Sequence, residues 1–260
     1  MSKTLEKGIQ LFELFTSDKP IWSMDEISEY TKIPKPTVYR LLKIFVDNEF
    51  LQKTTAENGE GYRFSLGLKF LELGSVVLST FDIRKIALPP MRELQQKFNE
   101  AVQLSYKDGE EGLYIEKVES TKPVRLYTRV GRKAPLYAGA CMRTILAFQP
   151  QEEIDYIISK NLNQIASGTP QSKDNVLQLL VQCRTEGYSY SISELEEGTF
   201  SIAVPIFNHE GQVKYSLSIA GIATSFSQQQ IKEFVTELWN VAAEISVGIG
   251  YKEPYPYGLL

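Results

Sequence analysis

The stretch KIPKPTVYRLLKIF, residues 32–45, predicts a helix with two faces of different character. Its apolar residues recur at i, i+3, i+4 and i+7, the spacing of a buried helical stripe. They are Val38, Leu41, Leu42 and Phe45. The other face is basic, because residues 31–46 contain four Lys and Arg residues and no carboxylate. In a chain whose formal net charge is −4, this segregated positive stretch indicates a surface for an anionic partner.

The flanking sequence predicts two earlier helices and a later hairpin. Residues 4–16 carry an amphipathic stripe. Ser23, followed three residues later by Glu26, gives the capping box of a short helix over about 24–31. Short apolar runs flank the polar, glycine-containing residues 54–61, which predicts two strands joined by a loose hairpin.

Three helices followed by a β-hairpin form a winged helix-turn-helix, whose third helix enters the major groove of DNA. Pro36 suits the first turn of that helix, where its missing N–H costs nothing. Side chains near this turn reach base edges, while lysines and arginines neutralise phosphates. The predicted DNA-binding residues are Lys32, Lys35, Pro36, Thr37, Tyr39, Arg40, Lys43 and Arg63. A solvated basic face on an ordinary helical domain is the alternative interpretation.

Composition bounds the other possibilities. Hydrophobic residues make up 43% of the 260 residues and charged residues 23%, as in a globular protein. No apolar run reaches the roughly 18 residues that span a bilayer, and the N-terminus lacks the apolar core of a signal peptide, so we expect a cytoplasmic protein. Cys141 and Cys183 are the only cysteines and lie far apart in the sequence, so we expect no disulfide framework and no zinc site. We also expect no other metal and no cofactor.

The middle of the chain predicts connecting helices. A helix leading out of the hairpin is predicted over residues 66–82, and a second helix over about 83–98, kinked or restarted at Pro89 and Pro90. This segment either packs passively or couples two domains and assists dimerisation.

From about residue 100 the pattern changes to alternating strands and helices. A hairpin is predicted around Asp108-Gly109, and another strand over 124–131. Three helices, three strands and a final helix opened by a second capping box, Ser227 with Gln230, follow. The helices are predicted over 141–149, 151–160 and 172–187, and the strands over 188–191, 200–207 and 213–221. The capped helix covers about twenty residues from 228. The order predicts an α+β domain with an antiparallel sheet.

Several segments together resemble the IclR family of bacterial transcription regulators over about residues 3–250. They are LEKGIQLFELF, SMDEISEYTKIPKPTVYRLLKIFVDNEFLQK, YRFSLGLKFLELG, VESTKPVRLYTRVGRKAPLYAGACMRTILAF and EGYSYSISELEEGTFSIAVPIFNHEGQVKYSLSIAG. The resemblance implies a winged helix-turn-helix over residues 1–66, a linker helix over 67–82 and a GAF-like effector-binding domain over 83–250. Residues 251–260 lie outside the resemblance, and we expect them to form a flexible tail. The family usually has Ser where Pro36 stands, so this chain lacks one hydroxyl and one N–H that could contact DNA.

In this family small molecules bind on one face of the C-terminal sheet. The positions that the resemblance carries over are Gly139, Ala140, Ser191, Ser201, Ser218 and Ala220. Gly139 and Ala140 precede a predicted helix, whose N–H groups and dipole favour an anion such as a carboxylate. The serine hydroxyls would add neutral hydrogen bonds. Some relatives carry an acidic residue at Ser191 and a second Ser at Ala220, which implies a different effector here.

The sequence gives little evidence of catalytic residues. His209 is the only histidine and lies in a predicted exposed turn, and Cys141 has no histidine base close in sequence. Glu194, Glu196 and Glu197 predict a solvated acidic loop rather than a paired-carboxylate site. We therefore do not expect an enzyme.

The sequence thus predicts a ligand-responsive transcription regulator, either repressor or activator. We expect a homodimer, or a dimer of dimers, that binds a double-stranded DNA operator and a small-molecule effector and has no membrane partner. The alternative is a sensory or enzymatic α+β domain whose N-terminal helices serve protein contacts.

Overall fold

The computed structural model divides into two compact units, Met1–Phe81 and Asp82–Leu260. It describes residues 3–16, 18–56, 61–80, 82–123, 128–160, 162–223 and 227–258. The helix predicted to link the two domains belongs by its contacts to the first unit.

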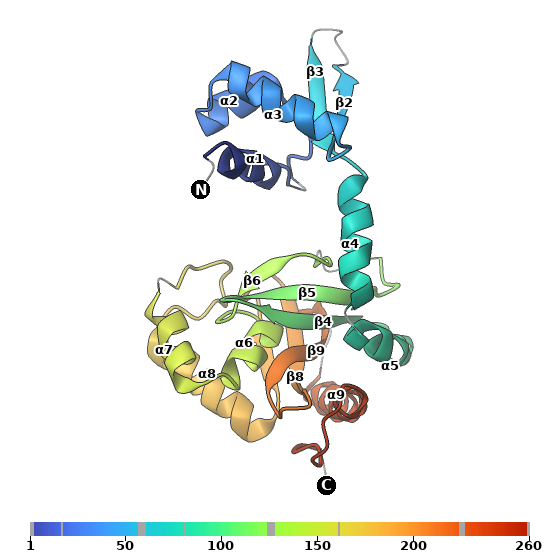
Figure 1. Ribbon diagram of the computed structural model, residues 1–260. Helices are drawn as coiled ribbons and strands as arrows, with labels where there is room; N and C mark the ends of the chain where they lie inside the picture. The colour runs from blue at the N-terminus through green and yellow to red at the C-terminus, as the bar shows by residue number, and fades with distance from the viewer. Residues whose placement is uncertain are drawn as a thin grey trace. The chain divides into compact units, whose positions relative to one another are not determined.

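The first unit is a winged helix-turn-helix (Figure 1). Its elements are α1 Lys3–Glu13, β1 Trp22–Ser23, α2 Met24–Thr31, α3 Lys35–Asp47, β2 Leu51–Thr55, β3 Tyr62–Leu66 and α4 Lys69–Thr80. The three strands are antiparallel in the order β1-β3-β2, with Trp22 opposite Phe64 and Leu51 opposite Leu66. The predicted helices and hairpin are confirmed, whereas the two-residue strand β1 was not predicted.

The capping box at the start of α2 has the predicted geometry. Glu26 N–H donates to Ser23 Oγ at 3.2 Å, and Ser23 N–H donates to the Glu26 carboxylate at 2.7 Å. The backbone hydrogen bond from Ser23 is the main reason why the pKa of Glu26 falls to about 2. The cap therefore fixes where α2 begins, so that Ile27 is buried in the core of this unit.

The start of α4 is held on the first unit. The Phe70 ring lies edge-on to Phe12 and Phe50, with ring centroids 5.0 and 5.4 Å apart. Just before it, a Cβ on Gly67 would lie 2.0 Å from the Glu49 carbonyl oxygen, so this close backbone approach requires glycine.

The second unit is built on a six-stranded antiparallel sheet in the order β6-β5-β4-β9-β8-β7. The strands are β4 Ala101–Asp108, β5 Glu111–Val118, β6 Lys133–Pro135, β7 Ser189–Ile192, β8 Thr199–Phe207 and β9 Val213–Ile222. The hairpin at Asp108-Gly109 is confirmed, with Gly109 at φ 62°. For the strand predicted over 124–131, residues 124–127 lie outside the described residues, and the described remainder forms a loop and turn, so that part of the prediction is wrong.

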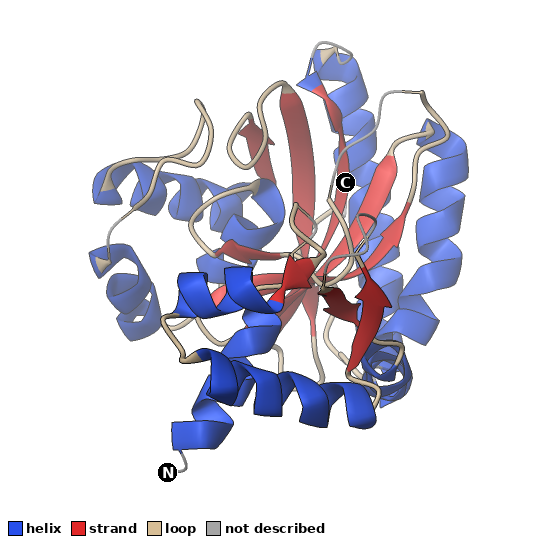
Figure 2. Cartoon of the chain, turned by 90° about the horizontal axis from the view of Figure 1, so that it is seen from above, coloured by secondary structure: helices blue, strands red, loops and turns tan. Residues whose placement is uncertain are grey.

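Helices cover both faces of this sheet, as Figure 2 shows. They are α5 Asp82–Phe98, α6 Ala140–Ala147, α7 Gln151–Ser159, α8 Lys173–Glu186 and α9 Gln228–Gly248. On one face α9 contributes Phe234, whose ring stacks on Phe200 at 6.2 Å. On the other face α6 is tied to the sheet, since the Ser216 hydroxyl donates to the Cys141 carbonyl. The α+β class is therefore confirmed.

Two further predictions concern the prolines of α5 and the start of α9. Helix α5 runs unbroken through Pro89 and Pro90, so the chain does not restart there. The second capping box is present, because Gln230 N–H donates to Ser227 Oγ and the Gln230 side chain accepts from Ser227 N–H.

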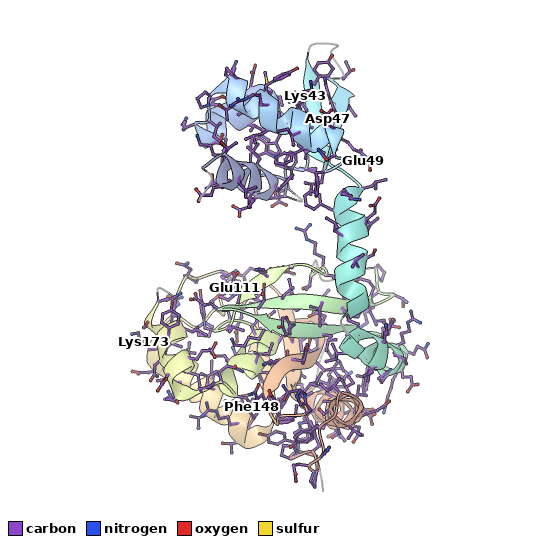
Figure 3. The ribbon with its side chains drawn as sticks, in the orientation of Figure 1. Lys43, Asp47, Glu49, Glu111, Phe148 and Lys173 are labelled. Carbon is purple, nitrogen blue, oxygen red and sulfur yellow. The ribbon has the colours of Figure 1, made fainter. Side chains whose placement is uncertain are left out.

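The last residues are docked rather than free, which differs from the flexible tail expected for 251–260. Tyr255 is buried, and its hydroxyl donates to the Pro205 carbonyl at 2.7 Å. The Tyr257 ring stacks on Trp239 and lies edge-on to Phe148, which Figure 3 labels. Aromatic packing thus fixes residues 251–258.

Candidate nucleic-acid interface and ligand cavity

Helix α3 separates its apolar and basic faces as its sequence predicts. Val38, Leu41 and Leu42 are buried in the core of the first unit. Most predicted DNA-binding residues of this stretch are exposed, and Thr37 is half-buried. The exposed ones are Lys32, Lys35, Pro36, Tyr39, Arg40 and Lys43, of which Figure 3 labels Lys43. The buried stripe therefore anchors the helix, and its basic side chains face solvent.

Carboxylates from α2 approach two of the predicted cations. Lys35 Nζ lies 2.8 Å from Asp25 Oδ1, and Arg63 Nη1 lies 2.9 Å from Glu26 Oε2. Both ion pairs are solvent-exposed and hence weak, so a phosphate can compete for either cation. Among the described residues, Lys32, Arg40 and Lys43 form no ion pair.

The wing adds a cation that the sequence did not single out. Lys53 Nζ on β2 lies 3.4 Å from the centre of the Tyr62 ring on β3, and Tyr62 is exposed. The two side chains come from neighbouring strands, so only the hairpin brings them together. The two residues are diagonal neighbours, because Lys53 lies opposite Phe64 and Tyr62 lies opposite Thr55, and long side chains can reach across such a diagonal.

The sheet face under α6 is unusually polar. In one row across the strands Ser191 lies opposite Ser201, which lies opposite Ala220. In the next row Ser218 lies opposite Gln103. Residues opposite one another, or two apart on a strand, share a face, so all of these side chains point to α6.

A small cavity lies between this face and the start of α6. Five of the six predicted effector residues line it, namely Gly139, Ala140, Ser191, Ser201 and Ala220. The other lining residues are Gln103, Tyr114, Thr128, Glu194, Leu195, Glu196, Thr199 and Phe200. Its volume is about 30 Å³, which is room for a water molecule or two.

The two predicted anion-binding N–H groups have acceptors within the protein. Gly139 N–H donates to Glu194 Oε2 at 2.8 Å, and Ala140 N–H donates to Ser191 Oγ at 3.1 Å. Gly139 has φ 81°, and a Cβ there would lie 2.7 Å from Leu195, so glycine is required at this bend. The start of α6 therefore lies at the cavity, and its two N–H groups already donate to oxygens of the protein, those of Glu194 and Ser191.

Glu194 corrects the expectation of a wholly solvated acidic loop. Its side chain is 7% exposed and forms an ion pair with Arg143 of α6, which is 1% exposed. The second guanidinium nitrogen of Arg143 donates to the Tyr190 carbonyl. Glu196 pairs with Arg132, and only Glu197 is exposed. Charge at the cavity is therefore balanced internally, and burying a cation requires such a partner.

Ser218, the sixth predicted effector residue, does not line the cavity. The Cys141 thiol donates to its hydroxyl at 3.0 Å, and burial raises the pKa of that thiol. A buried thiol that stays protonated is no nucleophile. His209, with a side chain 70% exposed, lies in the turn between β8 and β9 as predicted. Among the described residues no cluster of three or more His, Cys, Asp or Glu side chains could hold a metal ion.

Among the described residues, none of the helices combines the length and the hydrophobicity of a membrane-spanning segment. The exposed basic helix with its wing, and a second unit enclosing a polar cavity, together define a DNA-binding transcription regulator. Comparison with known proteins agrees. The model of the bacterial transcriptional regulator IclR C-terminal domain matches residues 75–247, and that of the IclR helix-turn-helix domain matches residues 4–55.

The similarity to known proteins extends over nearly the whole chain. The HTH-type transcriptional regulator KipR of Bacillus subtilis is 43% identical over 251 residues, covering 96% of this chain and 98% of KipR. The crystal structure of the Thermotoga maritima IclR is 30% identical with a TM-score of 0.77, covering 95% and 99% of the two chains. An IclR homolog from Microbacterium hydrocarbonoxydans, complexed with 4-hydroxybenzoate, is 25% identical with a TM-score of 0.81 over 95% and 99%. The chain belongs to the IclR family, and it is a transcription regulator rather than an enzyme.

Proposed function

We propose that this regulator binds a double-stranded DNA operator as a homodimer, or as a dimer of dimers, in the cytoplasm. The exposed basic side of α3 carries the proposal. Thr37, Tyr39 and Arg40 contact bases near the start of the helix, and Lys32, Lys35, Lys43 and Arg63 contact phosphates. Pro36 opens the helix without an N–H of its own.

The second part of the proposal is that a small organic carboxylate controls DNA binding from the cavity. A carboxylate is a stronger acceptor than a hydroxyl, so it can replace Ser191 Oγ at the Ala140 N–H, while the freed Ser191 hydroxyl donates to it. Gly139 and Ala220 shape the site, Ser201 adds a hydroxyl, and Ser218 supports it by holding Cys141.

Two observations support a carboxylate effector. Arg143 lies behind the helix start and makes the local potential less negative than Glu194 alone would. The Microbacterium homolog was solved with 4-hydroxybenzoate, itself a small carboxylate. The cavity is too small for such a ligand as it stands, so the effector must favour a second, wider conformer, as any ligand that shifts an equilibrium must.

The test is a fluorescence-anisotropy titration with the DNA upstream of the protein's own gene, across a salt series. We expect binding at least about a hundredfold tighter than to scrambled DNA, with a salt slope that counts phosphate contacts. Equal affinity for both DNAs, with and without a panel of carboxylates, would contradict the proposal. Ser218→Ala should weaken the effector response and leave the DNA affinity of the free protein unchanged.

A further inference from the structure

A second cavity lies at the edge of the six-stranded sheet that β7 forms. Its walls come from α6, α8, α9, β7 and the residue just before β7. Its volume is about 280 Å³, against about 30 Å³ for the cavity beside the start of α6, and the two cavities share no lining residue. A space of this size is close to the lower limit of small-molecule sites in proteins.

The β7 side of this edge cavity carries a hydroxyl without a partner. Ser189 Oγ is one of four buried side-chain polar atoms that lack a hydrogen-bond partner in the described part of the chain, the others being Gln103 Nε2, Ser105 Oγ and Ser201 Oγ. Ser189 is 4% exposed, and the neighbouring Cys183 sulfur is a weak acceptor. A buried hydroxyl without a partner costs stability, so its place in the cavity wall indicates that a ligand atom pairs with it.

The charges around the edge cavity leave one carboxylate open to a ligand. The Arg143 guanidinium lies in the wall, but Glu194, which lines the other cavity, already neutralises it. Glu186, at the end of α8, is exposed and forms no ion pair among the described residues. Burial and this nearby carboxylate raise the pKa of Tyr188, so the phenol stays neutral. A ligand therefore meets one net negative charge, at the rim.

The rest of the wall is largely apolar. Tyr188 and Tyr190 are half-buried, and the Tyr188 ring lies edge-on to Trp239 with the ring centroids 6.4 Å apart. Leu179 of α8 and Ile231 of α9 add aliphatic surface. Aromatic rings beside a carboxylate favour a cation that has a carbon body.

We infer that the edge cavity is a second ligand site, which binds a small organic ammonium compound that carries a hydroxyl group at its far end. The ammonium group pairs with Glu186 at the rim, the carbon body lies against the apolar wall, and the hydroxyl meets Ser189. The site is separate from the proposed effector cavity and does not depend on it. It gives the regulator a second input, of opposite charge to a carboxylate effector.

Isothermal titration calorimetry of the full chain tests the inference with three phenyl compounds of similar size. Tyramine carries both groups, phenethylamine lacks the hydroxyl, and tyrosol has an alcohol in place of the ammonium group. We expect tyramine to bind about tenfold more tightly than phenethylamine, which leaves Ser189 unpaired. The advantage over tyrosol should be about fivefold, because an exposed ion pair contributes little. Failure of tyramine to bind at millimolar concentration overturns the inference.

Two variants should remove the two preferences separately. Ser189→Ala should abolish the preference over phenethylamine and keep the preference over tyrosol, and Glu186→Gln should do the reverse. The matched controls are Ser105→Ala, which removes another unpartnered buried hydroxyl, and Glu152→Gln, which removes another exposed carboxylate. Neither control residue lines the edge cavity, so both ratios should stay at their parental values. Ratios that survive in the two variants, or that fall equally in the controls, overturn the inference.

A competition experiment tests the sign of the charge. Phloretate is the analogue of tyramine with a carboxylate in place of the ammonium group, and it should not displace tyramine. Displacement would show that Arg143 rather than Glu186 meets the ligand, and would overturn the inference. DNA binding and the carboxylate effector are judged by their own titrations, so a failure here leaves the proposed function standing.

Discussion

Helices α3 and α6 both begin beside a site that we propose to bind a ligand, yet they hold their charges in opposite ways. The ion pair nearest the start of α3, Lys35–Asp25, has side chains 59% and 69% exposed. On α6 the pair Arg143–Glu194 is 1% and 7% exposed. Exposed charges stay available to a polyanion, whereas buried charges must be neutralised within the protein. We therefore expect the two proposed sites to recognise their ligands by different means.

Breaking each pair tests this contrast, and the buried pair should give the largest effect. Glu194→Ala leaves Arg143 buried without its partner and should lower the free energy of unfolding by about 3–5 kcal/mol. The control, Asp25→Ala, breaks the exposed pair and should cost about 1 kcal/mol or less. Urea denaturation followed by circular dichroism measures both, and similar losses in the two variants would contradict the comparison.

The second-largest effect is expected on DNA affinity, from the exposed basic face of α3. Arg40→Ala should weaken operator affinity about tenfold and make its salt dependence shallower, because one cation facing DNA is lost. Lys173→Ala is the matched control, since this exposed lysine lies on α8 in the other unit (Figure 3). Both are measured by anisotropy. Unchanged affinity in Arg40→Ala would remove α3 from the interface.

The third effect concerns the docked tail. Tyr255→Phe removes the buried hydrogen bond to the Pro205 carbonyl and should cost about 1 kcal/mol of unfolding free energy. Tyr257→Phe loses a hydrogen bond at an exposed site, to the Arg184 carbonyl, and should cost less. Denaturation curves rank the two losses of stability, and the reverse order would contradict the prediction. No loss in either variant would show that the tail is held by its rings alone.

The smallest effect concerns pH and the cap of α2. The pKa of Glu26 is lowered to about 2 in the folded chain from an ordinary value of 4.5. Its contribution is thus present above pH 4.5 and is lost as the pH falls toward 2. The side chain is 39% exposed, and solvent screening keeps the contribution to about 1 kcal/mol or less.

The variant Glu26→Gln should therefore lose less stability than the parent between pH 4.5 and 2. Its control is Glu29→Gln, an exposed position on the same helix, which should follow the parent. Thermal melts of the full chain at each pH measure the difference. Parallel pH curves for parent and Glu26→Gln would show that the cap works without the carboxylate charge.

Much of the fold was predictable because its signals are local. The Ser23–Glu26 cap, Pro36 and the Ser227–Gln230 cap each act within one helical turn, and each lies where the sequence places it. Strand β1 escaped prediction because two residues show no alternation. The docking of Tyr255 escaped because its partner, Pro205, is 50 residues away and belongs to a strand.

The residues of the cavity likewise fall into those that local signals predict and those that depend on partners far away in the sequence. Five lining residues were expected from the resemblance, and alternation on the strands explains why they share a face. The Glu194–Arg143 pair spans 51 residues, and a run of three glutamates in a loop gives no sign of which one is buried. Gln103 was missed for a similar reason, since nothing local separates a buried amide that has a partner from one that lacks it.

The alternation of β9 also constrains how this regulator can evolve. Ser216, Ser218 and Ala220 occupy every second position of one strand, locked in register with β4 and β8. Ala220 lines the cavity, whereas Ser216 and Ser218 hold Cys141 of α6 against the sheet. Exchanging any one of the three changes one of these contacts and leaves the hydrogen-bond ladder intact. Inserting or deleting a single residue would instead turn all three to the opposite face. A change in what the cavity can hold is therefore reached by point substitution, and changes in length are confined to the loops.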